Sequence, residues 1–279
     1  MKSVLITGAN GFVGSALVRR LDSEGWHVIP SARKRFDDKT LVLDFESEQF
    51  YSQVNCLPRV DAIVHLATKV GFGDQSIDEL YVSNVAATAA LVSIAKRMGA
   101  QFVFSSAALI AGLRTSRIGI NSDDRPEIPY MLSKQLGEQL VRASGVSASI
   151  LRIGGIFGLE GPDHLGINRS IKSVLNGSPP LLHGSGEAVR NYIYVKDVAE
   201  AIVYALNNRV EGTHLVAGRE PMVVSQMLQT ICDVLHPGMK PEQMPGDRGF
   251  DQIVEPSPTL PDARSFKAAL LDIANEVCQ

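Results

Sequence analysis

The chain has 279 residues, of which 45% are apolar, and its formal net charge is -3. These values predict a globular protein with a large core, organised as one large domain or as a domain with an added lobe. The basic residues are spread along the chain, so we expect no nucleic-acid partner. No apolar run approaches the roughly 20 residues that a membrane span requires, and a strand pattern begins almost at once, so we expect a cytoplasmic protein without a membrane partner.

Short apolar runs alternate with segments of helical period through the first half of the chain. The strand-like runs are residues 3–7, 27–31, 41–45, 62–67 and 101–106, and the helix-like segments are 12–25 and 77–99. This alternation predicts an α/β fold with a doubly wound parallel sheet that is covered on both faces.

After residue 157 the order loosens, with clusters of Gly and Pro before a helix-like segment at 195–208 and a strand-like run at 213–217. A last helix is expected near 264–276. We therefore predict a dinucleotide-binding domain over 1–155 that also receives about 190–217. A smaller, C-terminal substrate-binding lobe is expected over 156–189 and 218–279.

The residue types that bind metals are scattered. Cys56, Cys232 and Cys278 show no CxxC spacing, and His65 and His183 have no partners at metal spacing. We therefore expect reduced cysteines, structural histidines and no metal site.

The segment GANGFVG places Gly8, Gly11 and Gly14 between the first strand and the first helix. Glycine lets the backbone turn tightly and approach a pyrophosphate, whose charge is met by free amides at the helix N-terminus. A plain glycine-rich turn is the alternative. The strand before and the helix after supply the context that the motif requires, so the segment predicts a dinucleotide site in a Rossmann-like fold.

With its GxxGxxG spacing, this segment and several later ones resemble the extended short-chain dehydrogenase/reductase superfamily, in its NAD(P)-dependent epimerase/dehydratase group. The later segments are LVLDF, HLAT, SNVAAT, YMLSK, LRIGGIFG and RNYIYVKDVAEAI, in the family's order. The resemblance implies a homodimeric enzyme with a small-molecule substrate. It also implies that Asp44 contacts the adenine and that residues 66–68 pass under the cofactor. The full set of cofactor-binding positions expected from these motifs is Gly8, Asn10, Gly11, Phe12, Val13, Gly14, Asp44, Phe45, Leu66, Ala67, Thr68, Asn84, Tyr130 and Lys134.

The end of the second strand indicates which cofactor binds. An acidic side chain there would accept hydrogen bonds from a free ribose 2′-hydroxyl and repel a 2′-phosphate. Residues 31–35 instead read SARKR, without a carboxylate. A guanidinium can hold a phosphate bidentately, so Arg33 predicts a preference for NADP(H) over NAD(H). The alternative is a solvated basic loop.

Two segments share one tyrosine–lysine spacing, YMLSK at 130–134 and YIYVK at 192–196. The first lies in a segment of helical period, and residues four apart on a helix approach within about 5 to 6 Å between Cβ atoms. The second has strand character, and four residues along a strand span about 13 Å. The pattern therefore favours the first pair as catalytic, with a packed aromatic and an exposed lysine as the alternative.

The chemistry expected of this pair is acid–base catalysis. The Lys134 ammonium should lower the pKa of Tyr130 from about 10 toward the working pH. Tyr130 would then exchange a proton with a substrate hydroxyl or carbonyl while hydride moves to or from the nicotinamide. Lys134 would orient both Tyr130 and the nicotinamide ribose.

The chain departs from the family pattern at two positions. Family members carry a Ser or Thr after the fifth strand, where ungapped counting gives Ala107; Ser106, one residue earlier, is the candidate for this catalytic and substrate-contacting role. Many sugar-nucleotide enzymes have an Asn where this chain has Gly155. Arg190 matches a basic residue that often meets the substrate's diphosphate, and a structural salt bridge is the alternative.

These residues and the family that they resemble imply an NADP-dependent oxidoreductase or epimerase that acts on a hydroxyl or keto group of a nucleotide-linked sugar. A reductase of a small non-nucleotide ketone is the alternative within the enzyme class, favoured by Gly155 and the short C-terminal lobe. A catalytically silent NADP-binding sensor or scaffold is the alternative outside it, which Ala107 permits and the Tyr130/Lys134 pair opposes.

Overall fold

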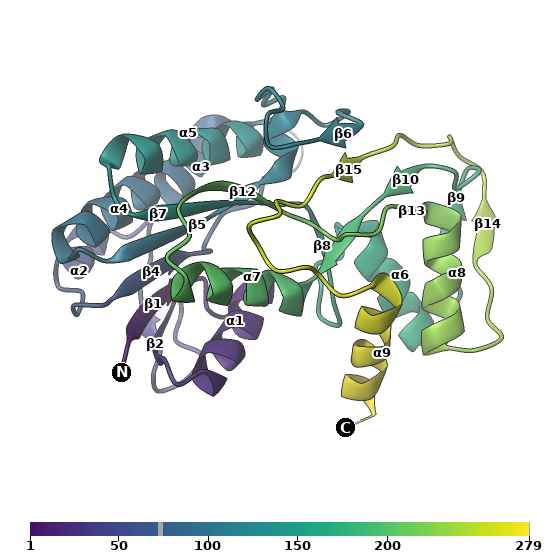
Figure 1. Ribbon diagram of the computed structural model, residues 1–279, viewed down its shortest axis with the longest axis horizontal. Coiled ribbons are helices and arrows are strands. Elements are labelled where there is room, and N and C mark those ends of the chain that lie inside the picture. The colour runs from purple at the N-terminus through teal and green to yellow at the C-terminus, as the bar shows by residue number, and fades with distance from the viewer. Residues whose placement is uncertain (72–74, 279) are drawn as a thin grey trace. The chain divides into compact units, whose positions relative to one another are not determined.

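The computed structural model describes residues 1–71 and 75–278. The chain divides into two compact units, labelled by element in Figure 1. The first unit contains Met1–Leu113, Asp123–Ile153 and Val198–His214, and the second contains Arg114–Ser122, Gly154–Asp197 and Leu215–Gln279. The predicted boundaries had placed residues 114–122 in the first domain. The assignment of cofactor to the first unit and of substrate to the second stays a prediction.

A seven-stranded sheet, in the order β12-β7-β5-β4-β1-β2-β3, forms the centre of the first unit. The strand pairs from β7 to β3 are all parallel. The predicted α/β fold with a doubly wound parallel sheet is therefore confirmed. The strands are β1 Ser3–Thr7, β2 His27–Ala32, β3 Leu41–Val42, β4 Ala62–His65, β5 Gln101–Ala107, β7 Ala148–Ile153 and β12 Gly212–Val216.

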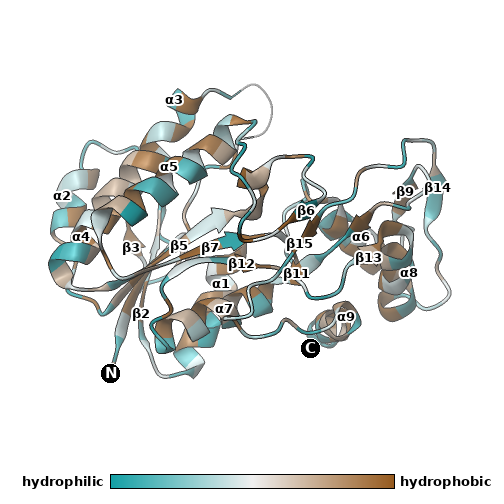
Figure 2. Cartoon of the chain, turned by 45° about the horizontal axis from the view of Figure 1, so that its top comes forward, coloured by the Kyte–Doolittle hydropathy of each residue, from teal (hydrophilic) through white to brown (hydrophobic). Residues whose placement is uncertain are grey.

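Helices cover both faces of this sheet, with α4 and α5 side by side on one face and α1 and α7 on the other (Figure 1). Each carries both polar and apolar residues (Figure 2), as expected of a helix with one face against a core. Buried side chains of the core include Leu5, Ile63, Leu91 and Phe102. The helices around the sheet are α1 Phe12–Ser23, α2 Phe50–Asn55, α4 Ala87–Met98, α5 Pro129–Ser144 and α7 Val195–Asn207.

The segment predicted as one helix over 77–99 has three parts. It consists of α3 Ile77–Leu80, the π-helix η1 Tyr81–Ala86 and α4. By length and composition alone Ile77–Met98 could cross a membrane, with a mean hydropathy of 1.2, which differs from the expectation that no such run exists. In this structure Leu80, Leu91 and Ile94 of the run are buried in the protein core.

Helix α5 turns a partly polar face inward. Its buried residues include Met131, Ser133, Lys134 and Glu138, whereas Leu132, Leu136 and Leu140, the leucine stripe seen in the sequence, are only half-buried. Because the inward face carries charged groups, hydrophobic period alone does not identify it.

The second unit is built from short strand pairs and three helices. The pairs are β6 Arg117–Ile118 with β15 Ile253–Val254, β8 Gly155–Phe157 with β11 Tyr192–Tyr194, β9 Leu181–His183 with β14 Glu242–Met244, and β10 Val189–Arg190 with β13 Met222–Val223. Helix α8 packs against both α6 and α9. The helices are α6 Gly166–Leu175, α8 Val224–Leu235 and α9 Phe266–Val277.

Candidate active site

The glycine turn after β1 has no room for side chains. Gly8 has a φ of 70°, and a Cβ there would lie 2.8 Å from the backbone nitrogen of Ala67. A Cβ on Gly14 would lie 2.1 Å from the carbonyl oxygen of Gly8. Asn10 and Gly11 are exposed at the turn, and the next two residues open α1 with free N-terminal amides.

This turn lies where the strand order of the sheet reverses, since β1 has β4 on one side and β2 on the other. Ligands of open α/β sheets bind at the carboxyl ends of the strands at such a point. A turn that must stay free of side chains, followed by a helix N-terminus, fits the pyrophosphate of a dinucleotide. Phe12 and Val13 are half-buried at the start of α1.

The loop after β4 is tied to β1 and to η1. Leu66 and Ala67 donate backbone hydrogen bonds to Thr7, each over 3.3 Å. Thr68 donates its hydroxyl to the amide oxygen of Asn84 over 3.2 Å. Residues 66–68 are half-buried, as positions beside a cofactor would be.

Asn84 connects this loop to α5. It accepts the backbone N–H of Lys69 over 2.7 Å, donates to the carbonyl oxygen of Lys69 over 2.9 Å, and donates to the hydroxyl of Ser133 over 3.0 Å. Asn84 is 3% exposed and lies in the π-helix, a distortion common at functional sites. The contacts show it organising the loop, and the predicted cofactor contact stays a prediction.

The loops after β2 and β3 carry the residues predicted to lie at the adenine end of the cofactor. Arg33 is exposed directly after β2. The side chain of Asp44 accepts the backbone N–H of Glu46 over 3.1 Å, which bends the chain where the sequence predicted a strand to 45. Phe45 packs edge-on against Phe50 and His65, at centroid distances of 5.1 and 5.8 Å.

Tyr130 and Lys134 lie one turn apart on α5, as predicted, and the catalytic role of the pair stays a prediction. Lys134 Nζ is 5.9 Å from the centroid of the Tyr130 ring and donates a hydrogen bond to the carbonyl oxygen of Ser105 over 2.8 Å. Lys134 is 4% exposed. Its buried ammonium therefore faces the ring and a strand carbonyl.

Burial has opposite effects on the two groups. It lowers the pKa of Lys134 to about 7, although the carboxylate of Glu138 opposes that change. It raises the pKa of Tyr130 to about 12. The expectation that the ammonium lowers the pKa of Tyr130 is therefore wrong for this structure, because loss of hydration disfavours the phenolate.

The hydroxyl of Ser106 is engaged elsewhere. It donates a hydrogen bond to the carboxylate of Glu138 over 2.5 Å, and both residues are buried. Ala107, at the family's hydroxyl position, is 8% exposed. The role of Ser106 as a donor to substrate stays a prediction, and this contact weighs against it.

Two charged residues near Tyr130 and Lys134 were not predicted from the sequence. Glu138 lies four residues after Lys134, and it binds Arg152 of β7 through two nitrogens over 2.8 Å. Two signals in the sequence could have found them. Arg152 is a charged residue within the apolar strand run LRI, and Glu138 is a carboxylate at helical spacing from Lys134.

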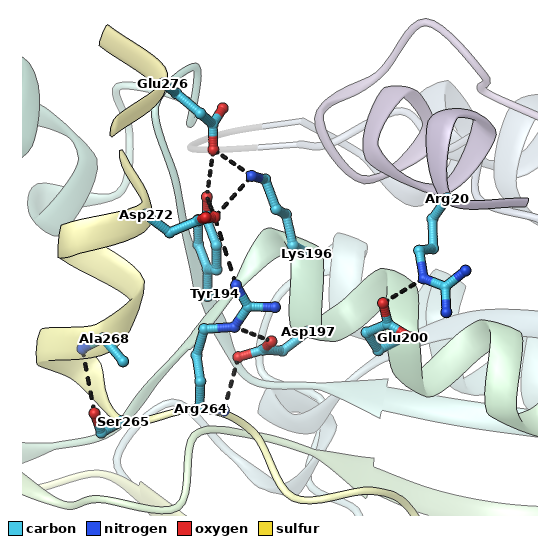
Figure 3. Close-up of polar contacts among 10 residues, drawn as sticks. All are labelled: Arg20, Tyr194, Lys196, Asp197, Glu200, Arg264, Ser265, Ala268, Asp272 and Glu276. Carbon is cyan, nitrogen blue, oxygen red and sulfur yellow. Dashed lines mark hydrogen bonds and ion pairs between the residues drawn. The ribbon is translucent and has the colours of Figure 1, made fainter. Parts of the chain in front are cut away.

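The second tyrosine–lysine segment belongs to an ion-pair cluster, drawn in Figure 3. Strand β11 ends at Tyr194 and α7 begins at Val195, so the predicted strand does not extend to Lys196. Lys196 pairs with Asp272 and Glu276 of α9, at 2.7 and 2.5 Å. Its ring neighbour is Tyr194, at 5.8 Å, and not the Tyr192 of the motif.

Arg190 lines a cavity of about 370 Å³ in the second unit. Its guanidinium stacks on the ring of Phe250 at 4.5 Å and donates to the side chain of Gln252 over 3.4 Å. No salt bridge to Arg190 occurs among the described residues. The cavity is lined by Gly166, Ile167, Arg169, Ser170, Ser173, Pro180, Leu181, His183, Arg190, Tyr192, Val224, Met227 and Leu228.

Gly155 leaves no room for the family's Asn. A Cβ on Gly155 would lie 2.6 Å from the ring of Tyr192, its partner across the β8–β11 pair. The departure seen in the sequence is therefore matched by the packing of a neighbouring aromatic ring. Within residues 1–71 and 75–278, no group of three His, Cys, Asp or Glu side chains could hold a metal ion.

Known proteins resemble this chain in sequence and in fold. The UDP-glucose 4-epimerase of Azospirillum brasilense is 28% identical over 298 residues, covering 90% of this chain and 85% of that protein. The crystal structure of UDP-N-acetylglucosamine 4-epimerase from Bacillus cereus has a TM-score of 0.86 at 23% identity, covering 100% of both chains. UDP-glucuronic acid 4-epimerase from Bacillus cereus, solved in complex with NAD, has a TM-score of 0.80 at 18% identity, covering 99% of this chain and 100% of that chain.

The family model of the NAD dependent epimerase/dehydratase family matches residues 4–218. This match runs from the first strand and its glycine turn, through the tyrosine–lysine helix, into the second unit. The chain therefore belongs to the NAD dependent epimerase/dehydratase family.

Proposed function

We propose that this enzyme uses NADP(H) to transfer hydride to or from a nucleotide-linked sugar, as an epimerase or an oxidoreductase, with Tyr130 as acid and base. The observation that carries the proposal is Lys134, whose buried ammonium lies against the Tyr130 ring and bonds to β5 at its carboxyl half. The relatives described above are named for UDP-sugars, which supports the substrate class.

The protein's own groups would hold and move the proton. When bound, the cofactor supplies or accepts the hydride. Because the pKa of Tyr130 is raised to about 12, its phenol stays protonated near neutral pH and can donate to a carbonyl oxygen that gains negative charge. Lys134 has N–H donors beyond the one given to Ser105, and these would bind ribose hydroxyls.

The preference for NADP(H) rests on the loop after β2. Arg33 is exposed there. The pKa of the Glu46 carboxylate is lowered chiefly by its hydrogen bond with Lys69, and the charge of Arg33 lowers it further. Glu46 pairs with Lys69 at 3.1 Å and accepts the hydroxyl of Ser83 over 2.9 Å. A carboxylate with these partners has less capacity to accept a ribose 2′-hydroxyl, which favours a 2′-phosphate on Arg33.

Calorimetric titration tests this preference. Arg33→Ala should weaken NADPH binding more than NADH binding, by about 1.5 to 3 kcal/mol for a charge-assisted contact. Arg35→Ala, in the same exposed basic run, is the matched control. Equal losses for the two cofactors in Arg33→Ala would exclude a 2′-phosphate contact.

The nucleotide end of the substrate would enter the cavity of the second unit. Arg190, Arg169 and His183 line it beside apolar residues of α6 and α8. A diphosphate needs cationic donors and a base needs apolar walls, and this lining supplies both. The substrate-binding role predicted for Arg190 is retained here on that basis.

A substrate panel decides among the candidate functions. The enzyme is mixed with NADP(H) and either UDP- and dTDP-sugars or simple ketones, and both NADPH absorbance and product NMR are recorded, because a redox-neutral epimerisation leaves absorbance unchanged. We expect conversion of nucleotide sugars. Conversion of simple ketones alone would contradict the substrate class, and cofactor binding without any conversion would favour a silent sensor.

We also propose that the enzyme is a cytoplasmic homodimer that pairs through α5 and η1. The leucine stripe of α5 is half-buried, and Tyr81 and Val82 of η1 are 50% and 44% exposed. Apolar residues left partly open on adjacent helices suit contact with a second copy. Light scattering should give twice the chain mass, and a monomer at micromolar concentration would contradict the dimer.

A further inference from the structure

A cluster of polar and charged side chains surrounds the buried carboxylate of Glu138 in the first unit. We call it the Glu138 cluster, and it consists of Ser106, Asp124, Glu138, Arg142 and Arg152. Glu138, with an exposure of 0%, accepts hydrogen bonds from Ser106 over 2.5 Å, from Arg142 over 2.6 Å, and from two nitrogens of Arg152 over 2.8 Å. Arg152 also pairs with Asp124 at 2.8 Å. These partners replace the water that a buried carboxylate has lost.

The cluster and the candidate catalytic lysine bind two consecutive residues of β5. Lys134 and Glu138 lie one helical turn apart, so both face the sheet. Lys134 donates to the carbonyl oxygen of Ser105, and Glu138 accepts from the hydroxyl of Ser106, the next residue of β5. One cation and one anion of α5 thus fix its position along β5, while Arg152 extends the same cluster to β7.

The ionisable groups that act on Lys134 come from two elements. Helix α5 supplies the Tyr130 phenol and the Glu138 carboxylate, and β4 supplies His65. His65 is neutral near pH 7, because burial and, to a smaller extent, Lys134 lower its pKa to about 3. Tyr130 is neutral as well, since burial raises its pKa to about 12. Glu138 therefore provides the negative charge that opposes the effect of burial on Lys134.

We propose that Glu138 is a positioning residue of this enzyme, whose buried carboxylate fixes α5 against β5 and β7 and is the counter-charge of Lys134. The inference rests on the proposed role of Tyr130 and Lys134. Glu138 acts through Lys134, and its loss should leave less of that lysine protonated near neutral pH. It also holds the hydroxyl of Ser106, which assigns that serine to the scaffold.

NMR titration of Lys134 tests the proposal without substrate. The full chain is labelled with 13C-lysine, the Lys134 signal is assigned by its absence in Lys134→Arg, and its titration midpoint is compared between the unmodified protein and Glu138→Gln. We expect the midpoint to fall by about half a pH unit or more, as removal of a neighbouring charge in a poorly screened site requires. Glu138→Asp, which keeps the charge, should recover most of the shift.

Arg142→Gln is the matched control, because it removes a contact to the same carboxylate from a side chain that is 45% exposed. In this variant the titration midpoint of Lys134 should stay within about 0.2 pH unit of its value in the unmodified protein, since solvent screens the charge of Arg142. The alkaline limb of turnover should move with the midpoint in Glu138→Gln. If Glu138→Gln does not fold, Glu138→Gln/Arg152→Met also removes the guanidinium that has lost this partner. A fall is still expected, smaller than in Glu138→Gln because a positive charge is removed as well.

An unchanged midpoint in a folded Glu138→Gln variant, or an equal fall in Glu138→Asp, would overturn the proposal. The titration is independent of activity. If nucleotide sugars are not converted, the proposed function fails, while the response of Lys134 to Glu138 can still be measured.

Discussion

The two tyrosine–lysine segments of this chain share a spacing and differ in every partner. On α5, Lys134 is 4% exposed and bonds to a backbone carbonyl, and burial lowers its pKa to about 7. At the start of α7, burial also lowers the pKa of Lys196, but hydrogen bonds to Asp272 and Glu276 outweigh it and raise the value (Figure 3).

The tyrosines differ in the same way. The Tyr194 hydroxyl donates to Asp272 and Glu276 over 2.9 and 2.8 Å, and its pKa is raised by burial and by these two carboxylates. Burial alone accounts for the raised pKa of Tyr130. A tyrosine and a lysine bound to carboxylates stabilise a fold, whereas a pair without them keeps donors free for a ligand. The partners, more than the spacing, decide which pair can react.

The largest expected difference is in turnover. Tyr130→Phe keeps the ring and removes the proton carrier, so turnover should fall by about 10² to 10⁴ while cofactor affinity is nearly kept. Tyr194→Phe should leave turnover of the folded protein within a few-fold, and so should Tyr192→Phe at saturating substrate, since Tyr192 lines the cavity. Steady-state rates and cofactor titrations measure both effects. A greater loss in either control than in Tyr130→Phe would reverse the assignment of the two segments.

Stability should show the opposite order. Tyr194→Phe removes the donor to two carboxylates from a residue that is 2% exposed, so the free energy of unfolding should fall by about 1 to 3 kcal/mol. Tyr130→Phe should change it by less, since no hydrogen bond of the Tyr130 hydroxyl occurs among the described residues. Urea denaturation of both variants gives the comparison, which fails if Tyr130→Phe is the less stable of the two.

The lysines should differ in how stability depends on pH. The folded pKa of Lys134 is lowered to about 7 from 10.5, so between these values the unfolded chain binds more protons than the folded one and stability rises with pH. The unmodified protein should therefore gain about 2 to 3 kcal/mol relative to Lys134→Met from pH 6 to pH 9.

Lys196→Met is the control for that series. The folded pKa of Lys196 is raised above 10.5, so its contribution is lost only as the pH rises beyond 10.5 and should be constant from pH 6 to pH 9. A flat difference for Lys134→Met over the same range would show that Lys134 stays charged in the folded protein.

The smallest effect is expected for Ser106→Ala. Because the Ser106 hydroxyl is bound to Glu138, single-turnover rates should fall by less than about threefold, in contrast to the 10² or more usual for loss of a transition-state donor. Ala107→Ser should be neutral or faster, since it restores a hydroxyl at the family's position. A loss near 10² in Ser106→Ala would return that serine to the catalytic residues.

Local patterns predicted the parts of the molecule that local chemistry controls. The glycine turn and the helix carrying Tyr130 follow from spacing within a few residues, and the parallel sheet follows from the alternation of strand-like and helix-like segments. Helix α2 and the π-helix were not anticipated, because a short helix and one extra residue per turn leave little trace in hydrophobic period. Strand β3 ends at Val42, and beyond it the Asp44 side chain accepts the backbone N–H two residues ahead, a contact typical of turns.

Partners distant in sequence could not be predicted. Lys196 pairs with Asp272, 76 residues later, and Glu138 of α5 pairs with Arg152 of β7. The contact with Asp272 helps to raise the pKa of Lys196, although the spacing of that lysine was readable in the chain. The expected pKa of Tyr130 was wrong for the same reason, because burial depends on the packed structure.

The contact between Gly155 and Tyr192 has a consequence for how this enzyme could diverge or be redesigned. Since a Cβ at 155 would lie 2.6 Å from the Tyr192 ring, the two positions are not free to vary one at a time. Introducing Asn at 155 alone should be penalised by overpacking, whereas the same change in a background with a smaller residue at 192 should be tolerated. The two sites are therefore epistatic, and a library that randomises them separately would miss the combinations in which an amide reaches this position.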